Sequence, residues 1–211
     1  MARCKEILEA GLNDLGLALE NGQIAQLLDF IKLIDKWNKT YNLTAIRDKA
    51  DMVSLHLLDS LSLLPFMEGS RVIDIGTGAG LPGLPLAICL PETEFTLLDS
   101  NAKKTRFVQQ AILELKLRNV TVHRGRVEQF HPEILFDAGL CRAFADLKEI
   151  VKMTGHLFNQ EGVLLAMKGQ MPQFELAQLP FPTSIIPLHV PGIAAARCLV
   201  RIKAFASSEE K

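Results

Sequence analysis

The chain has 211 residues, of which 48% are hydrophobic and 22% are charged, and its formal net charge is −1 at pH 7. This composition is ordinary for a globular protein with a buried core. A nearly neutral chain has no overall positive field that would draw it to nucleic acid, so an RNA-binding surface would have to be a local patch of basic side chains.

The first third of the chain, residues 1–67, is expected to form a helical extension. Apolar residues recur at intervals of three and four along residues 7–15 and 24–34, which is the spacing of one helix face. A third helix is expected from about residue 48 to residue 58. Pro65 and Gly69 then mark the end of this extension.

Residues 68–206 have a different pattern, in which short apolar, β-branched runs alternate with helical segments. Such alternation predicts parallel strands joined by right-handed helical crossovers in one domain. The strands are expected at residues 71–75, 94–98, 120–124, 136–141 and 162–167, and the helices at residues 82–90, 102–117 and 146–158.

Two further strand-like runs, residues 184–190 and 197–205, are separated by a short connection that contains Pro191 and Gly192. A connection of that length forms a hairpin and is too short for a parallel crossover. The predicted fold is therefore α/β and Rossmann-like, with a mostly parallel sheet, an antiparallel C-terminal hairpin and a frayed tail at residues 207–211.

A glycine-rich turn follows the first expected strand, at residues 76–80, with the sequence Gly-Thr-Gly-Ala-Gly. The glycines permit a tight turn and let a ligand approach the backbone without a Cβ in the way. Pro82 suits the first turn of the helix that follows. In a doubly wound sheet such a turn lies at the carboxyl end of the first strand, where cofactors bind.

The residues around this turn favour S-adenosylmethionine over a dinucleotide. The dinucleotide fingerprint GxGxxG requires glycine where this chain has Leu81. Asp74 precedes the first glycine by two residues, and an acid there would repel a pyrophosphate but attract the ammonium and sulfonium groups of S-adenosylmethionine. Asp99 ends the second strand, where an acid accepts hydrogen bonds from the ribose hydroxyls of either cofactor.

Charged residues also follow the later strands, at the edge where cofactor and substrate would meet. Arg126 and Glu128 follow the third strand, Arg142 follows the fourth, and Lys168 follows the fifth. These basic side chains, with those after Asp99, predict a rim that binds phosphates. The candidates for such contacts, which would be RNA contacts if the ligand is RNA, are Lys103, Lys104, Arg126 and Lys168.

Neither the cysteines nor the histidines are spaced as metal ligands. The cysteines at positions 4, 89, 141 and 198 form no CxxC pair, and we interpret the histidines at positions 56, 123, 131, 156 and 189 as structural or exposed. The chain shows neither a signal peptide nor an apolar run near the ~20 residues of a membrane span. We therefore expect a cytoplasmic monomer with no metal and no membrane contact.

The residues at the end of the fourth strand limit which kinds of methyl acceptor this chain could use. Methylation of an exocyclic amine typically uses an Asn/Asp-Pro-Pro-aromatic motif, whereas this chain has Cys-Arg-Ala-Phe at residues 141–144. Methylation of a pyrimidine carbon needs a nucleophilic cysteine, usually beside proline, and Cys141 has no such neighbour. Guanine N7 carries a free lone pair and needs only positioning and electrostatic stabilisation. Arg142 and Lys168 are the candidates for orienting such an acceptor.

Several motifs, in order along residues 36–175, resemble those of a known family. They are KWNKTYNLT at residues 36–44, HLLDSL at 56–61, VIDIGTGAGLPG at 72–83, LLDS at 97–100, RVE at 126–128, RAF at 142–144 and KGQ at 168–170. The motifs are similar to those of the RsmG family, also called GidB, of bacterial guanine-N7 methyltransferases of 16S ribosomal RNA. The resemblance implies a Rossmann-like class I domain that uses S-adenosylmethionine.

The resemblance also implies particular site residues and a guanine of the small ribosomal subunit as the acceptor. Arg142 would serve both the cofactor and the RNA, beside Lys103, Arg126 and Lys168. The implied cofactor-binding residues, in addition to Asp74, are Gly76, Gly78, Leu81, Asp99, Val127, Glu128 and Arg142.

Two other functions stay open on the residues alone. One is a methyltransferase that acts on a small molecule or a protein, although the basic strand-end loops disfavour it. The other is a non-catalytic module that binds a nucleoside. A dinucleotide-dependent oxidoreductase is a weaker third, because Leu81 breaks the dinucleotide fingerprint.

Overall fold

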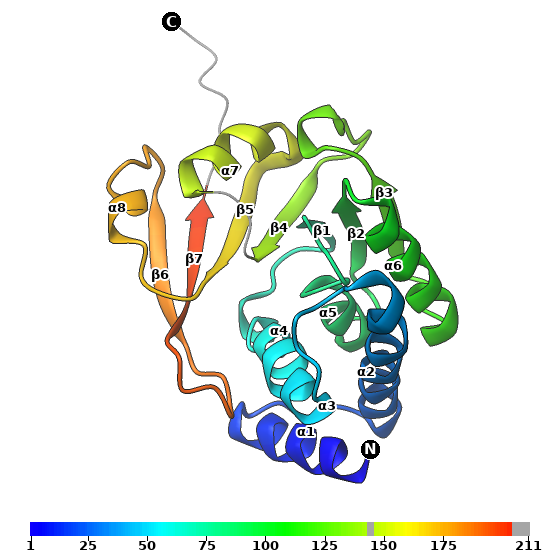
Figure 1. Ribbon diagram of the computed structural model, residues 1–211. Coiled ribbons are helices and arrows are strands. Elements are labelled where there is room, and N and C mark those ends of the chain that lie inside the picture. The colour runs from blue at the N-terminus through cyan, green and yellow to red at the C-terminus, as the bar shows by residue number, and fades with distance from the viewer. Residues whose placement is uncertain (143–145, 204–211) are drawn as a thin grey trace, which may run out of the picture.

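The computed structural model describes residues 1–142 and 146–203 of the chain. At its centre is a seven-stranded sheet with the order β3-β2-β1-β4-β5-β7-β6 (Figure 1). The strands are β1 (Arg71–Ile75), β2 (Glu94–Asp99), β3 (Val120–Arg124), β4 (Phe136–Arg142), β5 (Phe158–Lys168), β6 (Thr183–Leu188) and β7 (Arg197–Lys203). Ala143, Phe144 and the tail expected at residues 207–211 lie outside the described residues.

Strands β1 to β5 pair in parallel, whereas β7 pairs antiparallel with both β5 and β6. The one antiparallel strand therefore lies next to the edge strand β6, and the predicted fold class is confirmed. The helices after the first strand are α5 (Gly83–Cys89), α6 (Ala102–Leu115), α7 (Leu147–Thr154) and the short α8 (Gln173–Leu176).

Side chains that alternate along the strands feed two separate cores, one on each face of the sheet. Val72 and Leu97 point into the larger core, together with α5, α6 and the helical extension. Ile73 and Leu98 point into the smaller core, which α7 covers. The strand positions therefore alternate between two buried faces, as expected for a parallel sheet with helices on both sides.

The helical extension consists of three helical stretches that pack below the sheet in Figure 1. The capping box between Glu20 and Gln23 begins the second of them, and Asn42 ends it in a left-handed conformation with φ +50°. The elements are α1 (Ala2–Asp14), α2 (Asn21–Tyr41), and a continuous run of α3 (Lys49–Met52), a π-helical turn (Val53–Leu58) and α4 (Asp59–Leu61).

The helical extension and the sheet share one core. Phe30 of α2 is fully buried and stacks on Phe107 of α6, with 6.3 Å between the ring centroids. Leu8 and Leu57 belong to the same cluster as Leu84 of α5. The division of the chain at residue 67 marks a change of secondary structure, and its status as a domain boundary stays a prediction.

The expected helix at residues 146–158 was wrong at its C-terminal end. Helix α7 ends at Thr154, a 3₁₀ turn follows, and Phe158 begins β5, where it pairs with Phe136 of β4. The apolar spacing of the helix continues through the turn, so periodicity alone could not separate the helix from the strand. Among the described residues, no helix is both long and apolar enough to cross a membrane.

The shared core predicts that Phe30→Ala will destabilise the whole molecule. Because Phe30 is fully buried, we expect the free energy of unfolding to fall by about 3–5 kcal/mol. Phe174→Ala is the matched control, because the Phe174 side chain is 89% exposed and its loss should cost under about 0.5 kcal/mol. Urea denaturation of both variants tests this, and equal effects would contradict a common core.

Candidate functional site

The carboxyl ends of the parallel strands meet at one edge of the sheet. Asp99 of β2 pairs with Arg124 of β3, and Arg142 of β4 pairs with Met167 of β5. Because β7 runs in the opposite direction, its first residue, Arg197, lies at the same edge. Polar groups from β2, β3, β4 and β7 are thereby brought to one edge, as expected for a ligand site of an open α/β sheet.

Two depressions lie along this edge, on either side of the end of β1. The first depression has a volume of about 490 Å³ and the second about 460 Å³. The first is lined by Gly76, Leu98, Asp99, Ser100, Lys104, Gly125, Arg126, Val127, Glu128 and Met153. The second is lined by Ile46, Leu55, His56, Asp59, Arg142, Met167, Lys168, Gly169 and Arg197.

Asp99 is the acidic group of the first depression that the fold holds most firmly. Its Oδ2 accepts a hydrogen bond from the Gly78 backbone N–H at 2.9 Å, and its Oδ1 accepts one from the Asn101 N–H at 2.8 Å. The Lys104 ammonium lies 3.9 Å from Oδ2. Each carboxylate oxygen has a second lone pair, so Asp99 retains the capacity to accept hydrogen bonds from two hydroxyls.

The glycine turn takes backbone conformations that require glycine. Gly76 and Gly78 have φ values of +70° and +61°, which residues other than glycine rarely adopt. Among the described residues, a Cβ on Gly78 would meet only the Gly76 carbonyl and the Lys104 ammonium, each at 3.9 Å. The turn therefore leaves open space on the side of the first depression.

Asp74 lies behind this turn and not in the depression. The carboxylate is fully buried, and its Oδ2 accepts hydrogen bonds from the Thr77 hydroxyl at 2.6 Å and the Gly83 N–H at 2.9 Å. Its other oxygen, Oδ1, is buried and finds no hydrogen-bond partner in the described part of the chain. Burial raises the pKa of Asp74 to about 6, although the hydrogen bonds from Thr77 and Gly83 oppose this shift.

The other predicted cofactor residues do not all lie in the first depression. Val127 is buried and Glu128 is exposed, and both line the first depression. Leu81 is 4% exposed and packs into the larger core, away from the lining of the depression. Arg142 lies in the second depression. Sequence reasoning thus grouped residues that the structure separates into two neighbouring sites.

The predicted RNA-binding residues differ in how they are held. Lys103 is exposed at the start of α6, and Arg126 is exposed at the rim of the first depression. Lys104 lies inside the first depression. Lys168 donates a hydrogen bond of 2.7 Å to Glu175 Oε2, which also accepts from the Leu147 N–H of α7.

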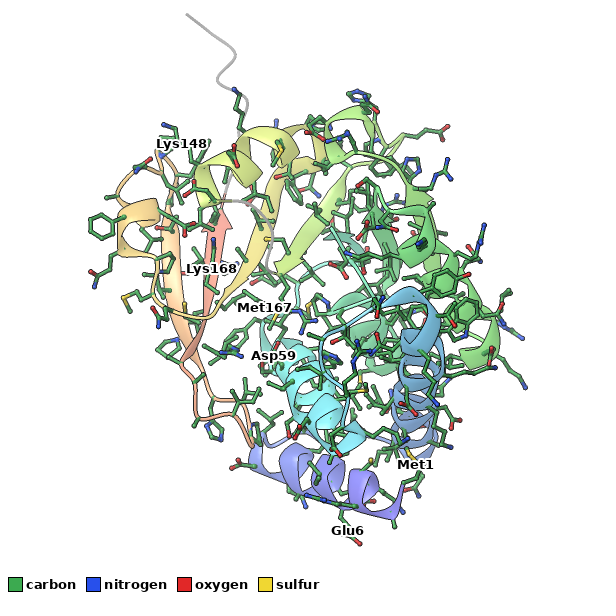
Figure 2. The ribbon with its side chains drawn as sticks, in the orientation of Figure 1. Met1, Glu6, Asp59, Lys148, Met167 and Lys168 are labelled. Atoms are coloured by element: carbon green, nitrogen blue, oxygen red, sulfur yellow. The ribbon has the colours of Figure 1, made fainter. Side chains whose placement is uncertain are left out.

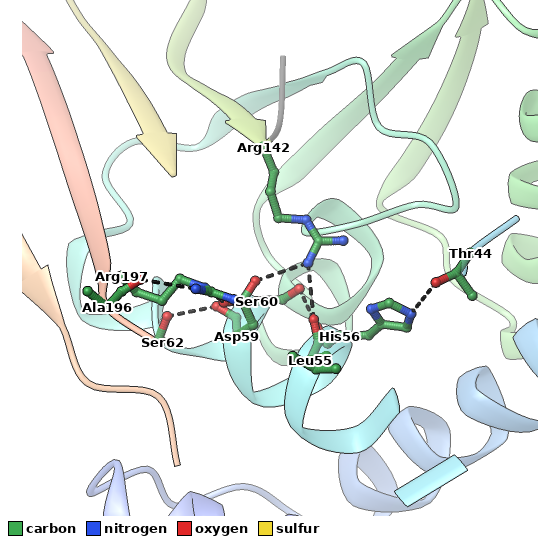
Figure 3. A network of polar contacts seen from close by, with 9 residues as sticks. All are labelled: Thr44, Leu55, His56, Asp59, Ser60, Ser62, Arg142, Ala196 and Arg197. Atoms are coloured by element: carbon green, nitrogen blue, oxygen red, sulfur yellow. Dashed lines mark hydrogen bonds and ion pairs between the residues drawn. The ribbon is translucent and has the colours of Figure 1, made fainter. Parts of the chain in front are cut away.

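A buried carboxylate organises the second depression. Asp59 is 4% exposed, and its two oxygens accept hydrogen bonds from Arg142 Nη1 at 3.0 Å and Arg197 Nε at 3.2 Å (Figure 3). Figure 2 shows Asp59 near Met167 and Lys168 at the end of β5. One side chain of the helical extension therefore joins the ends of β4 and β7.

His56 lies beside this network and is 6% exposed. Its Nε2 is 3.0 Å from the Thr44 hydroxyl, whereas its Nδ1 has no hydrogen-bond partner among the residues that the structure describes. Burial and the nearby Arg142 guanidinium lower the pKa of His56 to about 4, so the ring is neutral at physiological pH. Our interpretation of this histidine as merely structural or exposed missed its place in the lining of the depression.

Sequence reasoning also missed Asp59 and Arg197. Asp59 and His56 lie in the HLLDSL motif that carried the family resemblance, and this was the one available signal. Arg197 was hidden because only the antiparallel direction of β7 brings its first residue to this edge.

The cysteines show no sign of nucleophilic activation. All four are free, and burial raises the pKa of both Cys89 and Cys141 to about 12. Cys141 lies at the end of β4, close to the second depression, yet it would hold almost no thiolate at neutral pH. Among the described residues, no group of three or more His, Cys, Asp or Glu side chains is arranged to hold a metal ion.

The raised pKa of Asp74 predicts a pH-dependent effect of Asp74→Asn. Its usual pKa is 3.8, so protonation stabilises the fold below pH 3.8, and this stabilisation is lost as the pH rises through about 6. Asparagine keeps a carbonyl oxygen for Thr77 and Gly83 but does not titrate. The unfolding free energy of the variant should therefore rise relative to wild type by about 2 kcal/mol between pH 4 and pH 7.

Urea denaturation of both proteins at several pH values tests this prediction. His56 has the opposite dependence, since its lowered pKa removes stability as the pH falls from 6.5 toward 4. The difference between variant and wild type therefore isolates Asp74, and a difference that stays constant with pH would contradict the prediction.

The fold is shared with solved methyltransferase structures of low sequence identity. TrmN from Thermus thermophilus superposes with a TM-score of 0.55 at 20% identity, over 79% of this chain and 53% of that one. TYW2 from M. jannaschii, in complex with AdoMet, gives a TM-score of 0.53 at 13% identity, over 70% of this chain and 74% of that one.

Sequence comparison is more specific than fold. The protein named "Ribosomal RNA small subunit methyltransferase G" from Nitrosococcus oceani is 50% identical over 202 residues, which cover 94% of each chain. The Escherichia coli (strain SMS-3-5 / SECEC) protein of that name is 46% identical over 196 residues, or 92% of this chain and 95% of that one. The GidB family model, described as rRNA small subunit methyltransferase G, matches residues 23–198. The resemblance seen in the sequence motifs is thereby confirmed, and the chain belongs to the GidB family of small-subunit ribosomal RNA methyltransferases.

Proposed function

We propose that this chain transfers a methyl group from S-adenosylmethionine to N7 of a guanine in 16S ribosomal RNA, and that it does so as a monomer in the cytoplasm. Family membership supports the reaction and the RNA substrate. The structural observation that carries the choice of cofactor is the buried Asp74 carboxylate at the start of α5.

Asp74, behind the glycine turn, uses a backbone donor of α5 that a dinucleotide would need for its pyrophosphate. In dinucleotide-binding folds the pyrophosphate accepts hydrogen bonds from the backbone at the N-terminus of the helix that follows the glycine turn. Here the Gly83 N–H of α5 already donates to the Asp74 carboxylate. A second anion would meet like charge, whereas a cation is attracted.

The first depression has the groups that an adenosine needs. Asp99 can accept hydrogen bonds from the two ribose hydroxyls, and Gly76 and Gly78 leave room for close approach to the backbone. Val127 offers an apolar contact for the adenine, and Glu128 lies beside it. When bound, S-adenosylmethionine supplies an electrophilic methyl group on a positively charged sulfur.

The second depression is the proposed site of the acceptor guanine. It begins at Arg142, on the strand next to β1, so the two depressions are neighbours. Guanine N7 carries no proton, and the site accordingly needs no general base. Arg142 and Lys168 would orient the guanine and its phosphates, while the high thiol pKa of Cys141 argues against attack on a pyrimidine carbon.

The proposed RNA contacts lie on both sides of the depressions. Lys103 and Arg126 are exposed and available to phosphates, and Lys104 and Lys168 lie deeper, each beside an acidic side chain. Binding through such a local patch should weaken as the salt concentration rises, because phosphate contacts release counterions.

Labelled methyl transfer tests the proposed reaction. Small ribosomal subunits from a strain that lacks this protein are incubated with the pure protein and methyl-labelled S-adenosylmethionine, and the nucleosides are then analysed. We expect label on 7-methylguanosine. Label only on an exocyclic amine, a ring carbon or a ribose would refute the N7 assignment. Equal labelling of free metabolites or proteins, with none on subunits, would refute the RNA substrate.

The assignment of Asp99 to the cofactor site predicts that Asp99→Ala weakens S-adenosylmethionine binding. Loss of two hydrogen bonds to a charged group should lower the affinity roughly a hundredfold. Glu94→Ala is the matched control, because Glu94 is exposed at the opposite end of the same strand. Calorimetric titration of both variants measures the effect, and unchanged affinity of Asp99→Ala in a folded protein would remove this residue from the site.

A further inference from the structure

Within residues 1–142 and 146–203, one polar atom of the second depression's lining has no hydrogen-bond partner, and it belongs to a side chain that the reaction does not otherwise use. The His56 ring is 6% exposed, and this buried atom is its Nδ1. Figure 3 shows the ring between Thr44 and the Arg142 guanidinium. The Leu55 carbonyl accepts a hydrogen bond from Arg142 Nη1 at 3.3 Å and also lies close enough to the ring to oppose the lowering of the His56 pKa, but its placement does not meet the geometry of a hydrogen bond to Nδ1. An unpaired polar atom buried in a pocket lining is costly unless a ligand completes it.

The surroundings of His56 indicate which of its nitrogens carries the proton. The Thr44 oxygen already accepts a hydrogen bond from the Ile46 N–H at 3.2 Å. Within the described part of the chain, His56 Nε2 is the acceptor placed at the Thr44 hydroxyl, at 3.0 Å. If the hydroxyl donates to Nε2, both groups are satisfied and the neutral ring carries its proton on Nδ1. The orphan atom is then a hydrogen-bond donor.

A donor at this place suits one particular edge of a purine. Guanine presents N7 and O6 side by side on its major-groove edge, and both are acceptors. We infer that His56 Nδ1–H donates a hydrogen bond to O6 of the acceptor guanine and makes His56 a specificity-determining residue. This inference rests on the proposed function, because the proposed function places the acceptor guanine in the second depression.

The same donor rejects adenine. Adenine carries an amino group where guanine carries O6, so two N–H donors would face each other and both would be buried unpaired. A site built to hydrogen-bond one group discriminates strongly against an analogue that lacks it. A donor that holds O6 also fixes the base in its plane while N7 stays free of hydrogen bonds.

The rest of the pocket agrees with a flat, uncharged base. Leu55, Ile46 and Met167 provide apolar surface for the faces of a ring. The guanidinium groups of Arg142 and Arg197 both contact the Asp59 carboxylate, which neutralises one of their two positive charges. His56 itself is neutral, and with its proton on Nδ1 it acts as a donor and not as a base.

Two substitutions distinguish the hydrogen-bonding roles of the two ring nitrogens of His56. His56→Gln places an amide near the position of Nε2, where it keeps a partner for Thr44 but removes the donor at Nδ1. His56→Asn places its shorter amide near Nδ1 and restores a donor there. The control is His189→Gln, because His189 is exposed and pairs with Asp14 of α1, away from the second depression.

The substrate is varied in parallel with the protein. Small subunits are reconstituted with 16S RNA in which only the mapped acceptor is either guanosine or 6-thioguanosine, whose sulfur is a weak hydrogen-bond acceptor. Each protein is assayed on both RNAs, so that the interaction between His56 and O6 is measured as in a double-mutant cycle, with the sulfur substitution as the second change.

We expect wild type, His189→Gln and His56→Asn to lose rate on the thio substrate, whereas His56→Gln loses little. On guanosine, kcat/KM of His56→Gln should be lower by roughly tenfold to a hundredfold, with unchanged affinity for S-adenosylmethionine. Equal sensitivity of wild type and His56→Gln to the sulfur would overturn the inference. If wild type labels no guanine N7 at all, the proposed function has failed instead.

A measurement on the unmodified protein covers the case in which a variant does not fold. The nitrogen chemical shifts of the His56 ring distinguish the two neutral tautomers, and we expect the proton on Nδ1. Addition of the acceptor-containing subunit RNA fragment should shift the Nδ1–H resonance downfield. A proton on Nε2, or a resonance that does not move when the fragment binds, would overturn the inference.

Discussion

A carboxylate that is buried in an apolar interior must find hydrogen-bond donors, and two such carboxylates determine the shape of this site. Asp74 takes its donors from Thr77 and from the first residue of α5, and so fixes the glycine turn against the helix. Asp59 takes its donors from Arg142 and Arg197, and so fixes the helical extension against the sheet. Each aspartate thereby positions one of the two depressions.

The two carboxylates differ in cost because their partners differ. Asp59 is matched by two cations, whereas Asp74 has, among the described residues, only neutral donors for Oδ2 and none for Oδ1. Burial therefore raises the pKa of Asp74 to about 6, and the hydrogen bonds from the neutral donors only partly oppose this shift. An uncompensated negative charge beside a ligand site is tolerated where the ligand is a cation, which agrees with a sulfonium cofactor and disagrees with a phosphate-bearing one.

Local signals in the sequence predicted the elements and the first depression well. The limits of β1 and β3 were predicted to the residue, because apolar runs bounded by turn residues are local features. Asp99 and the glycine turn were found because they lie at the ends of such strands. Asp59, His56 and Arg197 were missed because their meeting depends on packing and strand direction, which spacing along the chain does not encode.

The missed residues all come from parts of the chain outside the repeating strand–helix units. The first depression is built entirely from the repeating strand–helix units, whereas the second takes His56 and Asp59 from the helical extension and Arg197 from the C-terminal hairpin. A cofactor common to many enzymes can be held by the common part of the fold, but an acceptor has to be recognised by groups that the common part lacks. The larger core joins the extension to the sheet, so the residues that the extension contributes to the second depression are anchored in the same core as the strand–helix units. On the proposed assignment, selection of the substrate depends on the packing of the π-helical turn and α4 as much as on the residues that touch the ligand.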